Sequence, residues 1–178
     1  MKNQREITRR ARAVRLLILD VDGVMTDGSI ILDNDGNEYK AFHVRDGHGI
    51  RMLMNAGIQV AIITGRGSKV VDLRAKELGI TEVYQKCKDK RAAFRKLLRK
   101  YSLSADDVAY IGDDIVDLPV MSQVGLPVAV ADATDEVKAH ASLVTKNRGG
   151  RGAVREVTDL ILRAKGLWKE LFSEYLKA

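Results

Sequence analysis

The sequence predicts an α/β protein whose parallel sheet is covered by helices on both faces. Short, nearly continuous apolar runs recur along the chain, and longer amphipathic segments separate them. Strands that are apolar throughout are typical of a sheet buried on both faces, and their alternation with helices is typical of right-handed βαβ units.

Six apolar runs are expected to be the strands, and helices are expected between them. The strands are expected at residues 14–20, 58–64, 82–84, 108–112, 126–130 and 142–144. The helices are expected at about residues 47–56, 67–78, 89–101, 114–123 and 134–140, with a last one from near Gly152. Residues 28–43 break this rhythm and predict a β-hairpin, because residues 34–37 (Asn-Asp-Gly-Asn) form a strong turn signal.

The composition is that of a single soluble domain spanning residues 1–178. The net charge is +6, and residues 1–15 carry six Lys and Arg against one Glu, so +5 of that charge lies there. We interpret residues 1–13 as a basic arm that forms a solvated helix, with nucleic-acid binding as the alternative. No apolar run approaches the ~20 residues of a membrane span, and Cys87 is the only cysteine, so we expect a cytoplasmic protein without membrane contact.

Acidic residues follow two of the predicted strands. Asp20 and Asp22 follow the first, Asp113 and Asp114 follow the fourth, and Asp117 comes one turn later. A single Asp after a strand is usually a turn or helix cap, but the carboxyl ends of parallel strands meet at one edge, where ligands bind. Carboxylates gathered there repel one another unless a cation lies between them, and ligands that are all oxygen favour Mg²⁺ over Zn²⁺.

Three further residues predict a phosphoryl site at the same edge. Thr64 and Gly65 end the second strand and offer a hydroxyl and backbone N–H groups. Lys90 begins a helix, where the helix dipole disfavours a cation, and this favours a ligand-binding role. Lys86 and Lys88 remain alternatives for that role.

Together these residues predict phosphoryl transfer through a covalent intermediate. Asp20 is expected to attack phosphorus, and Asp22 to protonate the departing alcohol and later to activate water. Mg²⁺ and Lys90 are expected to offset the negative charge of the nucleophile and the substrate.

These residues stand in segments that resemble the four motifs of the haloacid dehalogenase (HAD) superfamily. The segments are residues 20–24, residues 63–66, Lys90 and residues 112–117. Five more segments resemble the 3-deoxy-D-manno-octulosonate 8-phosphate (KDO 8-phosphate) phosphatases: residues 43–51, 108–114, 119–121, 128–133 and 149–157. The resemblance implies a Rossmann-like, HAD-like fold, a homotetramer, and hydrolysis of KDO 8-phosphate for lipopolysaccharide precursor synthesis.

The resemblance also implies roles for individual residues. The catalytic residues would be Asp20, Asp22, Thr64 and Lys90. Mg²⁺ would be held by Asp20, the Asp22 carbonyl and Asp113, with Asp114 and Asp117 behind them. The substrate would contact Asp22, His43, Val44, Arg45, Asp46, Gly47, Arg51, Gly65, Arg66, Arg74 and Lys90.

Two features depart from the family pattern. His43 and His48 stand where Asn and an aromatic residue are expected, so the sugar contacts are expected to differ. The tail, residues 166–178, carries an apolar stripe at helical spacing, formed by Leu167, Trp168, Leu171, Phe172 and Tyr175. We expect this stripe to pack on its own domain or on a neighbouring subunit.

The motif spacing leaves no room for a cap domain. Residues 20–64 can hold only the hairpin flap and one helix, and residues 64–90 one helix and one strand. An uncovered site would expose the intermediate to water, so a macromolecular substrate or another subunit must cover it. The resemblance favours the second option, with the apolar hairpin as a pairing surface and residues 149–152 reaching a neighbouring site.

Three other functions are compatible with parts of this pattern. A response-regulator receiver would need an Asp after the third strand, where the chain has residues 84–86 (Tyr-Gln-Lys). A phosphatase of a nine-carbon, sialic-acid-like keto acid phosphate would use the same machinery. A nucleic-acid end-processing phosphatase would use the basic arm and the open site.

Overall fold

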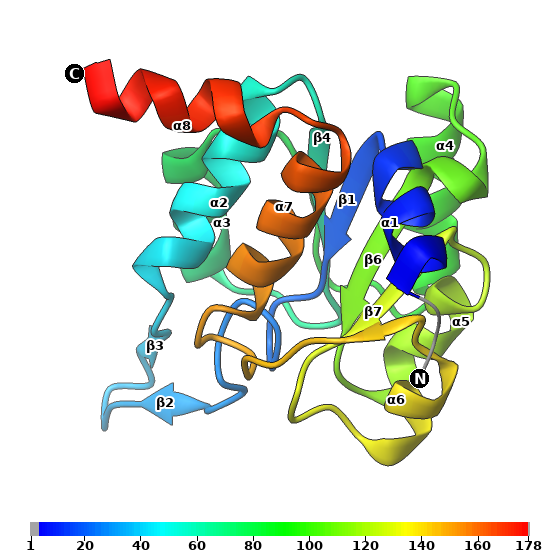
Figure 1. The fold of residues 1–178 in the computed structure, drawn as a ribbon. Helices are drawn as coiled ribbons and strands as arrows, with labels where there is room; N and C mark the ends of the chain where they lie inside the picture. Colours follow the sequence, from blue (N-terminus) through cyan, green and yellow to red (C-terminus); the bar gives the residue numbers. More distant parts are fainter. Residues whose placement is uncertain (1–3, 178) are drawn as a thin grey trace.

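A six-stranded parallel sheet forms the centre of the computed structural model, which describes residues 4–177 (Figure 1). Its strand order is β5-β4-β1-β6-β7-β8. The strands are β1 (Leu16–Leu19), β4 (Gln59–Ile63), β5 (Glu82–Tyr84), β6 (Val108–Gly112), β7 (Leu126–Ala129) and β8 (Leu143–Val144). The six strands predicted from the sequence are therefore confirmed.

Strand β1 lies at the centre of the sheet. All four of its residues are buried, and Leu16 pairs with Gln59 of β4 on one side and with Val108 of β6 on the other. The chain runs outward from β1 through β4 and β5, and then returns to form β6, β7 and β8 on the opposite side. The direction of winding changes beside β1, and this places a ligand-binding crevice at its carboxyl end.

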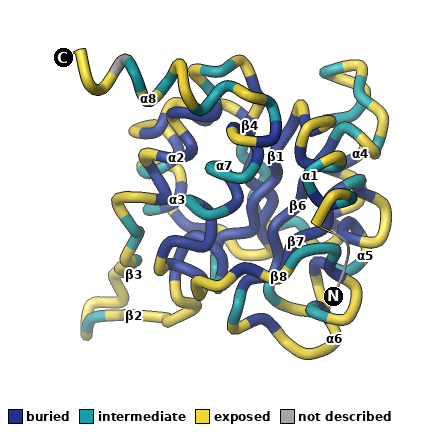
Figure 2. The backbone as a smooth tube through the Cα atoms, viewed as in Figure 1, coloured by how far each residue is buried: buried dark blue, intermediate teal, exposed yellow. Residues whose placement is uncertain are grey.

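Helices cover both faces of the sheet. Helix α7 packs against α1 and α2 on the face turned to the viewer in Figure 1, and α4 and α5 pack together on the other face. Buried backbone is concentrated in the sheet and on the inner sides of the helices (Figure 2). The helices are α1 (Gln4–Ala13), α2 (Val44–Asn55), α3 (Lys69–Leu78), α4 (Lys90–Tyr101), α5 (Leu118–Met121), α6 (Asp135–His140), α7 (Ala153–Ala164) and α8 (Trp168–Lys177), with 3-10 turns at Ala105–Asp107 and Ile115–Asp117.

The helix predicted at 114–123 is divided into the 3-10 turn Ile115–Asp117 and the short helix α5. Pro119 explains the division, because a continuous α-helix would need an N–H at this position to donate to the carbonyl of Ile115. The divided segment places Asp117 on the turn that follows Asp113.

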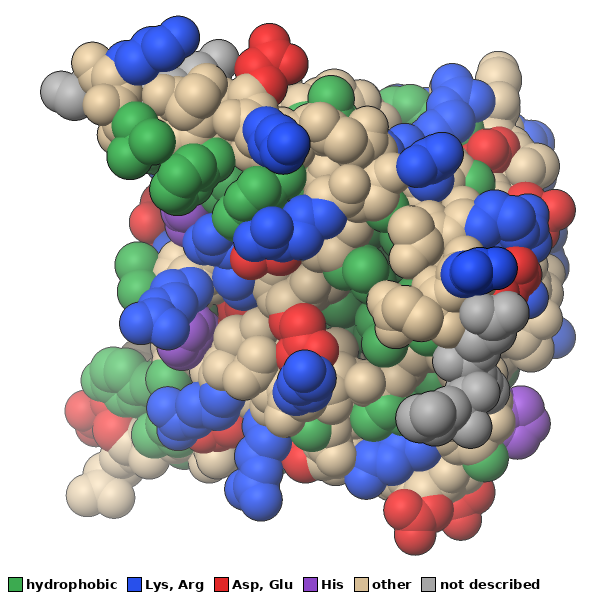
Figure 3. All heavy atoms as spheres, in the orientation of Figure 1, with side chains coloured by type: hydrophobic (Ala, Val, Ile, Leu, Met, Phe, Trp, Pro, Cys, Tyr) green, Lys and Arg blue, Asp and Glu red, His purple; other side chains and the backbone are tan. Residues whose placement is uncertain are grey.

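The basic N-terminal segment is helical, but it is docked rather than solvated. Ile7 and Ala11 are buried, and α1 packs along α7. Arg10 Nη1 donates to the carbonyl of Gly125 at 2.8 Å, and Arg12 Nε donates to the carbonyl of Ala164 at 2.9 Å. On the face drawn in Figure 3, Lys and Arg side chains are spread widely rather than gathered over α1. Part of the basic arm therefore stabilises the fold.

The predicted hairpin is present and projects from the sheet domain (Figure 1). Strands β2 (Ile31–Leu32) and β3 (Glu38–Tyr39) pair antiparallel, and the turn between them contains Gly36 at φ +81°. Between β1 and β4 the chain forms this hairpin and α2, and between β4 and α4 it forms α3 and β5, so neither segment holds a cap domain.

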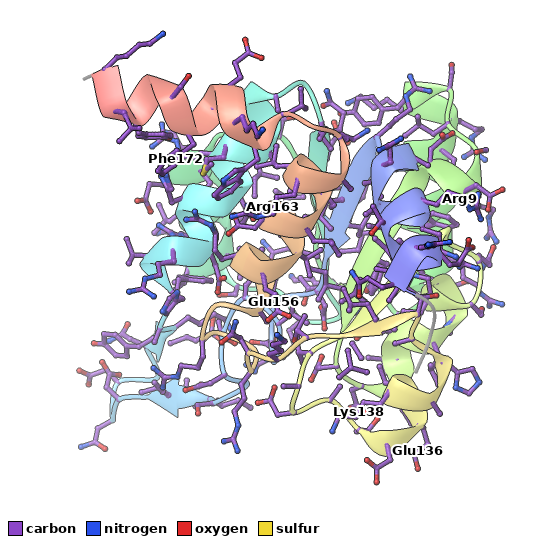
Figure 4. All side chains as sticks on the ribbon, viewed as in Figure 1. Arg9, Glu136, Lys138, Glu156, Arg163 and Phe172 are labelled. Atoms are coloured by element: carbon purple, nitrogen blue, oxygen red, sulfur yellow. The ribbon has the colours of Figure 1, made fainter. Side chains whose placement is uncertain are left out.

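The predicted tail helix, α8, packs on its own chain. Leu167, Trp168 and Leu171 are partly buried against the core, and Cζ of Arg163 lies 3.9 Å from the centre of the Trp168 ring. Figure 4 labels Arg163 on α7, beneath the tail helix. Phe172 and Tyr175 remain about half exposed. Within residues 4–177, no helix is both long enough and apolar enough to span a bilayer.

Candidate active site

A cavity of about 410 Å³ opens where β1, β4 and β6 end. It brings together most of the residues predicted at the ends of these strands. The lining residues are Asp20, Asp22, Gly28, Ile30, Thr64, Gly65, Arg66, Lys90, Asp113, Asp114 and Val116.

Asp20 lies at the floor of this cavity, directly after β1. Its backbone N–H donates to the carbonyl of Ile111, which extends the pairing of β1 with β6 by one residue. The carboxylate is buried, and Oδ1 lies 2.9 Å from Lys90 Nζ. Burial, together with the nearby charge of Asp117, raises the pKa of Asp20 to about 6, although Lys90 opposes this shift. The chain therefore places a buried, cation-paired carboxylate where a nucleophile is expected.

Gly23 is required because the Asp113 side chain lies against its backbone. Gly23 has φ +87°, a conformation that other residues rarely adopt. A Cβ at this position would overlap the carboxylate of Asp113. The turn after Asp20 and Asp22 can therefore bring its backbone close to Asp113 only if residue 23 is glycine.

Lys90 is held beneath the cavity by Asp117 and Tyr110. Lys90 Nζ lies 2.7 Å from Asp117 Oδ1 and 3.3 Å from the Tyr110 hydroxyl, which itself donates to Asp117 Oδ1 at 2.6 Å. Asp117 Oδ2 accepts from the backbone N–H groups of Asp113 and Asp114. Asp117 thus positions both Lys90 and the loop that carries Asp113.

Tyr110 was missed by the sequence analysis. It lies in the middle of β6, is fully buried, and has a pKa well above its usual value because of its burial and the charge of Asp117. A tyrosine within an otherwise aliphatic strand was the available signal, since a buried hydroxyl needs a hydrogen-bond partner.

The carboxylates fit a magnesium ion. Carboxylate oxygens of Asp20, Asp113 and Asp117 lie within 4.8 Å of one another, and Asp113 Oδ1 is buried without a hydrogen-bond partner. Burial, followed by the charges of Asp20 and Asp117, raises the pKa of Asp113 to about 8. A divalent cation would offset this repulsion. Because the oxygens of Asp117 are already bonded, Asp20 and Asp113 remain as the side-chain ligands, and oxygen-only ligands favour Mg²⁺.

Thr64 and Gly65 are fixed by the backbone around them. Thr64 is buried; its N–H donates to the carbonyl of Tyr84, and its own carbonyl accepts from the N–H of Cys87. The loop after β5 thereby holds the end of β4. Both residues line the cavity, and a hydroxyl with backbone N–H groups is suited to bind a phosphoryl group.

The acidic side chains of Asp22 and Asp114 differ in their contacts. Asp22 is about one-fifth exposed and forms an ion pair with Lys40 of the hairpin. Asp114 is exposed, and its Oδ1 accepts from the N–H of Ile115, so it caps the 3-10 turn. The possible metal cluster found among the described residues does not include the side chain of Asp22 or of Asp114.

Other predicted substrate residues lie away from this cavity. His43 and Arg45 line a second cavity of about 480 Å³ beside α7. Val44 is 78% exposed, and Arg51 is exposed on α2. These residues do not meet Asp20 within one chain.

Asp46, Gly47 and Arg74 are engaged inside the protein. Asp46 is buried, and it accepts from the N–H of Gly152 at 3.2 Å and of Arg155 at 2.7 Å, so it caps α7. The guanidinium of Arg74 lies against Gly47. The carboxylate of Asp46 is therefore bound to the start of α7, and a substrate contact by Asp46 stays a prediction.

The loop at residues 149–152 packs on the turn that follows Asp20. Gly150 N–H donates to the carbonyl of Val24, and Gly149 N–H donates to Asp132 Oδ1. A Cβ on Gly149 would overlap the backbone of Gly23. The loop therefore supports the turn that follows Asp20, while the Arg151 side chain remains 66% exposed.

The two histidines that depart from the family pattern have distinct surroundings. His43 Nδ1 lies 4.0 Å from Asp46 Oδ2. His48 meets the ring of Tyr175 edge to face, with 5.5 Å between the ring centres, and so joins α2 to the tail helix.

Comparisons with known proteins identify a family and several structures that this chain resembles. The haloacid dehalogenase-like hydrolase family matches residues 68–157. KDO 8-phosphate phosphatases from Yersinia pestis and Escherichia coli K12 are 56% and 53% identical, over 90% of this chain and 86% of theirs. The crystal structure of the Yersinia pestis enzyme has a TM-score of 0.91 at 54% identity, covering 92% of this chain and 89% of that one. The Moraxella catarrhalis enzyme, in complex with magnesium, phosphate and KDO, has a TM-score of 0.95 at 40% identity, covering 97% and 99%.

Proposed function

The chain belongs to the KDO 8-phosphate phosphatase family of haloacid dehalogenase-like hydrolases, and we propose that it releases phosphate from KDO 8-phosphate by way of an aspartyl-phosphate on Asp20. The observation that carries this proposal is the group of Asp20, Lys90 and Asp113 at one sheet edge, with Thr64 and Gly65 across the cavity. The free sugar acid would serve lipopolysaccharide precursor synthesis.

The reaction needs an aligned nucleophile. It also needs positive charge near the nucleophile and the phosphoryl group, because both are negatively charged and repel each other. An oxygen of Asp20 attacks phosphorus, while Lys90 and the Thr64 hydroxyl hold the phosphoryl oxygens. Mg²⁺ bound by Asp20, Asp113 and the Asp22 carbonyl supplies positive charge that offsets the charge on the phosphoryl group.

Asp22 moves the protons in both steps. As the bond between phosphorus and the sugar oxygen breaks, Asp22 donates a proton to that oxygen and the sugar leaves as an alcohol. Asp22 then takes a proton from a water molecule that attacks phosphorus, and Asp20 is released together with phosphate. Its partial exposure, 21% of the side chain, gives it access to both the sugar and water.

A homotetramer is proposed as the working form. The hairpin residues Ile30, Ile31 and Leu32 are 46–62% exposed, an unusual amount for three adjacent aliphatic side chains. The predicted substrate residues Val44, Arg45 and Arg51 lie outside the cavity of their own chain, and in an oligomer a neighbouring chain would bring them to a substrate. A cytoplasmic location is proposed with it, in keeping with the single cysteine.

Phosphate release from a panel of esters tests the substrate. The panel holds KDO 8-phosphate, the nine-carbon keto acid 9-phosphate, simple sugar phosphates and 5′-phosphorylated oligonucleotides, each with Mg²⁺ or with chelator. We expect a Mg²⁺-dependent preference for KDO 8-phosphate. A preference for another ester would overturn the substrate and leave the role of Asp20 to be tested separately.

A further inference from the structure

Two charged residues of the hairpin face the active site, and the tyrosine between them faces outward. Tyr39 is 54% exposed, whereas the side chains of Glu38 and Lys40 are 20% and 1% exposed. Side chains alternate between the two sides of a strand, so Tyr39 lies on one side of the hairpin, and its neighbours Glu38 and Lys40 lie on the other. The hairpin therefore inserts one acid and one ammonium group at the rim of the cavity.

Lys40 is a buried cation with two carboxylate partners. Its Nζ is paired with Asp22 Oδ1 and lies 3.4 Å from Glu38 Oε1. A buried ammonium group is costly unless opposite charges compensate it. Because only 1% of the side chain is exposed, the ammonium is out of reach of a substrate that enters from solvent. Any effect of Lys40 on the reaction must pass through its partners.

Glu38 connects this pair to the opposite rim of the cavity. One of its oxygens accepts from Arg66 Nη2 at 3.0 Å, and the other accepts from the hydroxyl of Ser68. Arg66 and Ser68 belong to the loop between β4 and α3. The hairpin is thus fastened across the site, with Lys40 at the point nearest to Asp22.

The two oxygens of Asp22 have different surroundings. Oδ1 is paired with Lys40, while Oδ2 lies 4.0 Å from Arg66 Nη1. Proton transfer requires one oxygen to be held at a fixed place beside the leaving group. An ion pair to one oxygen fixes the carboxylate plane and leaves the other oxygen available.

We propose that Lys40 is a positioning residue that orients Asp22, so that Oδ2 delivers the proton to the departing sugar oxygen. The proposal rests on the role of Asp22 given above. It assigns the hairpin a part in catalysis that differs from covering the site, because the hairpin supplies the cation that holds the acid in place.

The test compares two esters that need different amounts of acid assistance. A sugar phosphate releases a strongly basic alkoxide and depends on Asp22, whereas p-nitrophenyl phosphate releases a stable phenolate and depends on it little. In K40M, kcat/KM for KDO 8-phosphate is expected to fall on the order of 10²-fold, and by less than about tenfold for p-nitrophenyl phosphate. K40R, which keeps the cation, is expected to recover part of the loss.

A double-mutant cycle shows whether Lys40 acts through Asp22. In a D22N background, K40M is expected to cause no further loss, since the acid that it orients is already gone. D33A is the matched control, because Asp33 holds the hairpin turn by accepting from the N–H groups of Asp35 and Asn37. D33A loosens the hairpin, yet it is expected to lower kcat/KM only slightly and by the same factor for both esters.

Several outcomes would overturn the proposal. If K40M lowered kcat/KM equally for both esters, or lowered it further in the D22N background, Lys40 would have a structural role only. Should K40M not fold, as judged by circular dichroism, the neutral K40Q takes its place in both comparisons. If the wild type hydrolyses another alkyl phosphate instead of KDO 8-phosphate, the substrate proposal fails, and the comparison is made with that ester.

Discussion

Lys90 Nζ lies between the carboxylates of Asp20 and Asp117, at 2.9 Å from the first and 2.7 Å from the second. One cation thereby joins the end of β1 to the turn after β6. Burial lowers the pKa of Lys90, but the two carboxylates outweigh burial, so the pKa is raised and the ammonium stays charged. This ion-pair arrangement determines how the site responds to substitution and to pH.

Replacing Lys90 with methionine is expected to abolish most activity with KDO 8-phosphate. The change removes the charge that faces the phosphoryl group and leaves Asp20 and Asp117 buried without their ammonium partner, so kcat/KM should fall by at least about 10²-fold. Steady-state phosphate release measures this. K88M is the control, because Lys88 is exposed and was an alternative for the same role. If K88M were the more damaging change, the assignment of Lys90 would be wrong.

Replacing Gly23 with alanine is expected to weaken magnesium binding. Both the positive φ and the overlap with Asp113 oppose a Cβ, so the loop or the Asp113 ligand must shift. Titration calorimetry with Mg²⁺ should show at least about tenfold weaker binding. Gly36 has a similar φ of +81° with open space around it, so G36A should bind Mg²⁺ as the wild type does. Unchanged binding in G23A would contradict the geometry described for Asp113.

Stability without metal is expected to fall as the pH rises. The folded state raises the pKa of Asp20 from 3.8 to about 6 and that of Asp113 from 3.8 to about 8. Between the unfolded and folded values the folded chain holds more protons than the unfolded chain, so the free energy of unfolding decreases with rising pH across that window. Thermal melts with chelator at about pH 6 and about pH 8.5 measure the decrease.

Magnesium should reverse this loss, and D113N should reduce it. The ion binds the ionised carboxylates, so its stabilising effect should be greater at the higher pH. D113N removes one titrating group, and its melts with chelator should depend less on pH over the same range. A wild-type melting temperature that rises with pH across this range would show that the metal-free fold does not disfavour the ionised forms of the two carboxylates.

Replacing Asp46 with alanine is expected to lower stability more than it affects the chemical step. Its carboxylate caps α7 through two backbone N–H groups, and loss of such a cap costs about 1–2 kcal/mol. Urea unfolding measures this cost, with the exposed-turn variant D35A as control. A variant of full stability with a greatly raised KM would instead support the original expectation of a substrate contact.

The residues at strand ends were predictable because their position depends on local patterns. Buried aliphatic runs define where β1, β4 and β6 end, and parallel strands end at one edge, so Asp20, Thr64 and Asp113 could be brought together from the sequence. The same pattern predicted the hairpin, since residues 34–37 favour a tight turn.

Contacts between distant segments were not predictable in this way. The contact of Lys40 with Asp22 depends on how the hairpin is aimed, and Asp46 meets an N–H group 109 residues later in the chain. The docking of α1 depends on the surface that α7 offers to it. Each of these requires the packed fold, because local periodicity does not specify which surfaces meet.

Trapping the phosphorylated enzyme tests the central claim most directly. Wild-type protein and D20N are mixed with KDO 8-phosphate and Mg²⁺, quenched in acid within one turnover, digested, and analysed by mass spectrometry. We expect the mass of one phosphoryl group on the wild-type peptide that contains Asp20, none on the D20N peptide, and no phosphate release by D20N. Substantial turnover by a folded D20N protein, or a phosphoryl group on another residue, would contradict Asp20 as the nucleophile.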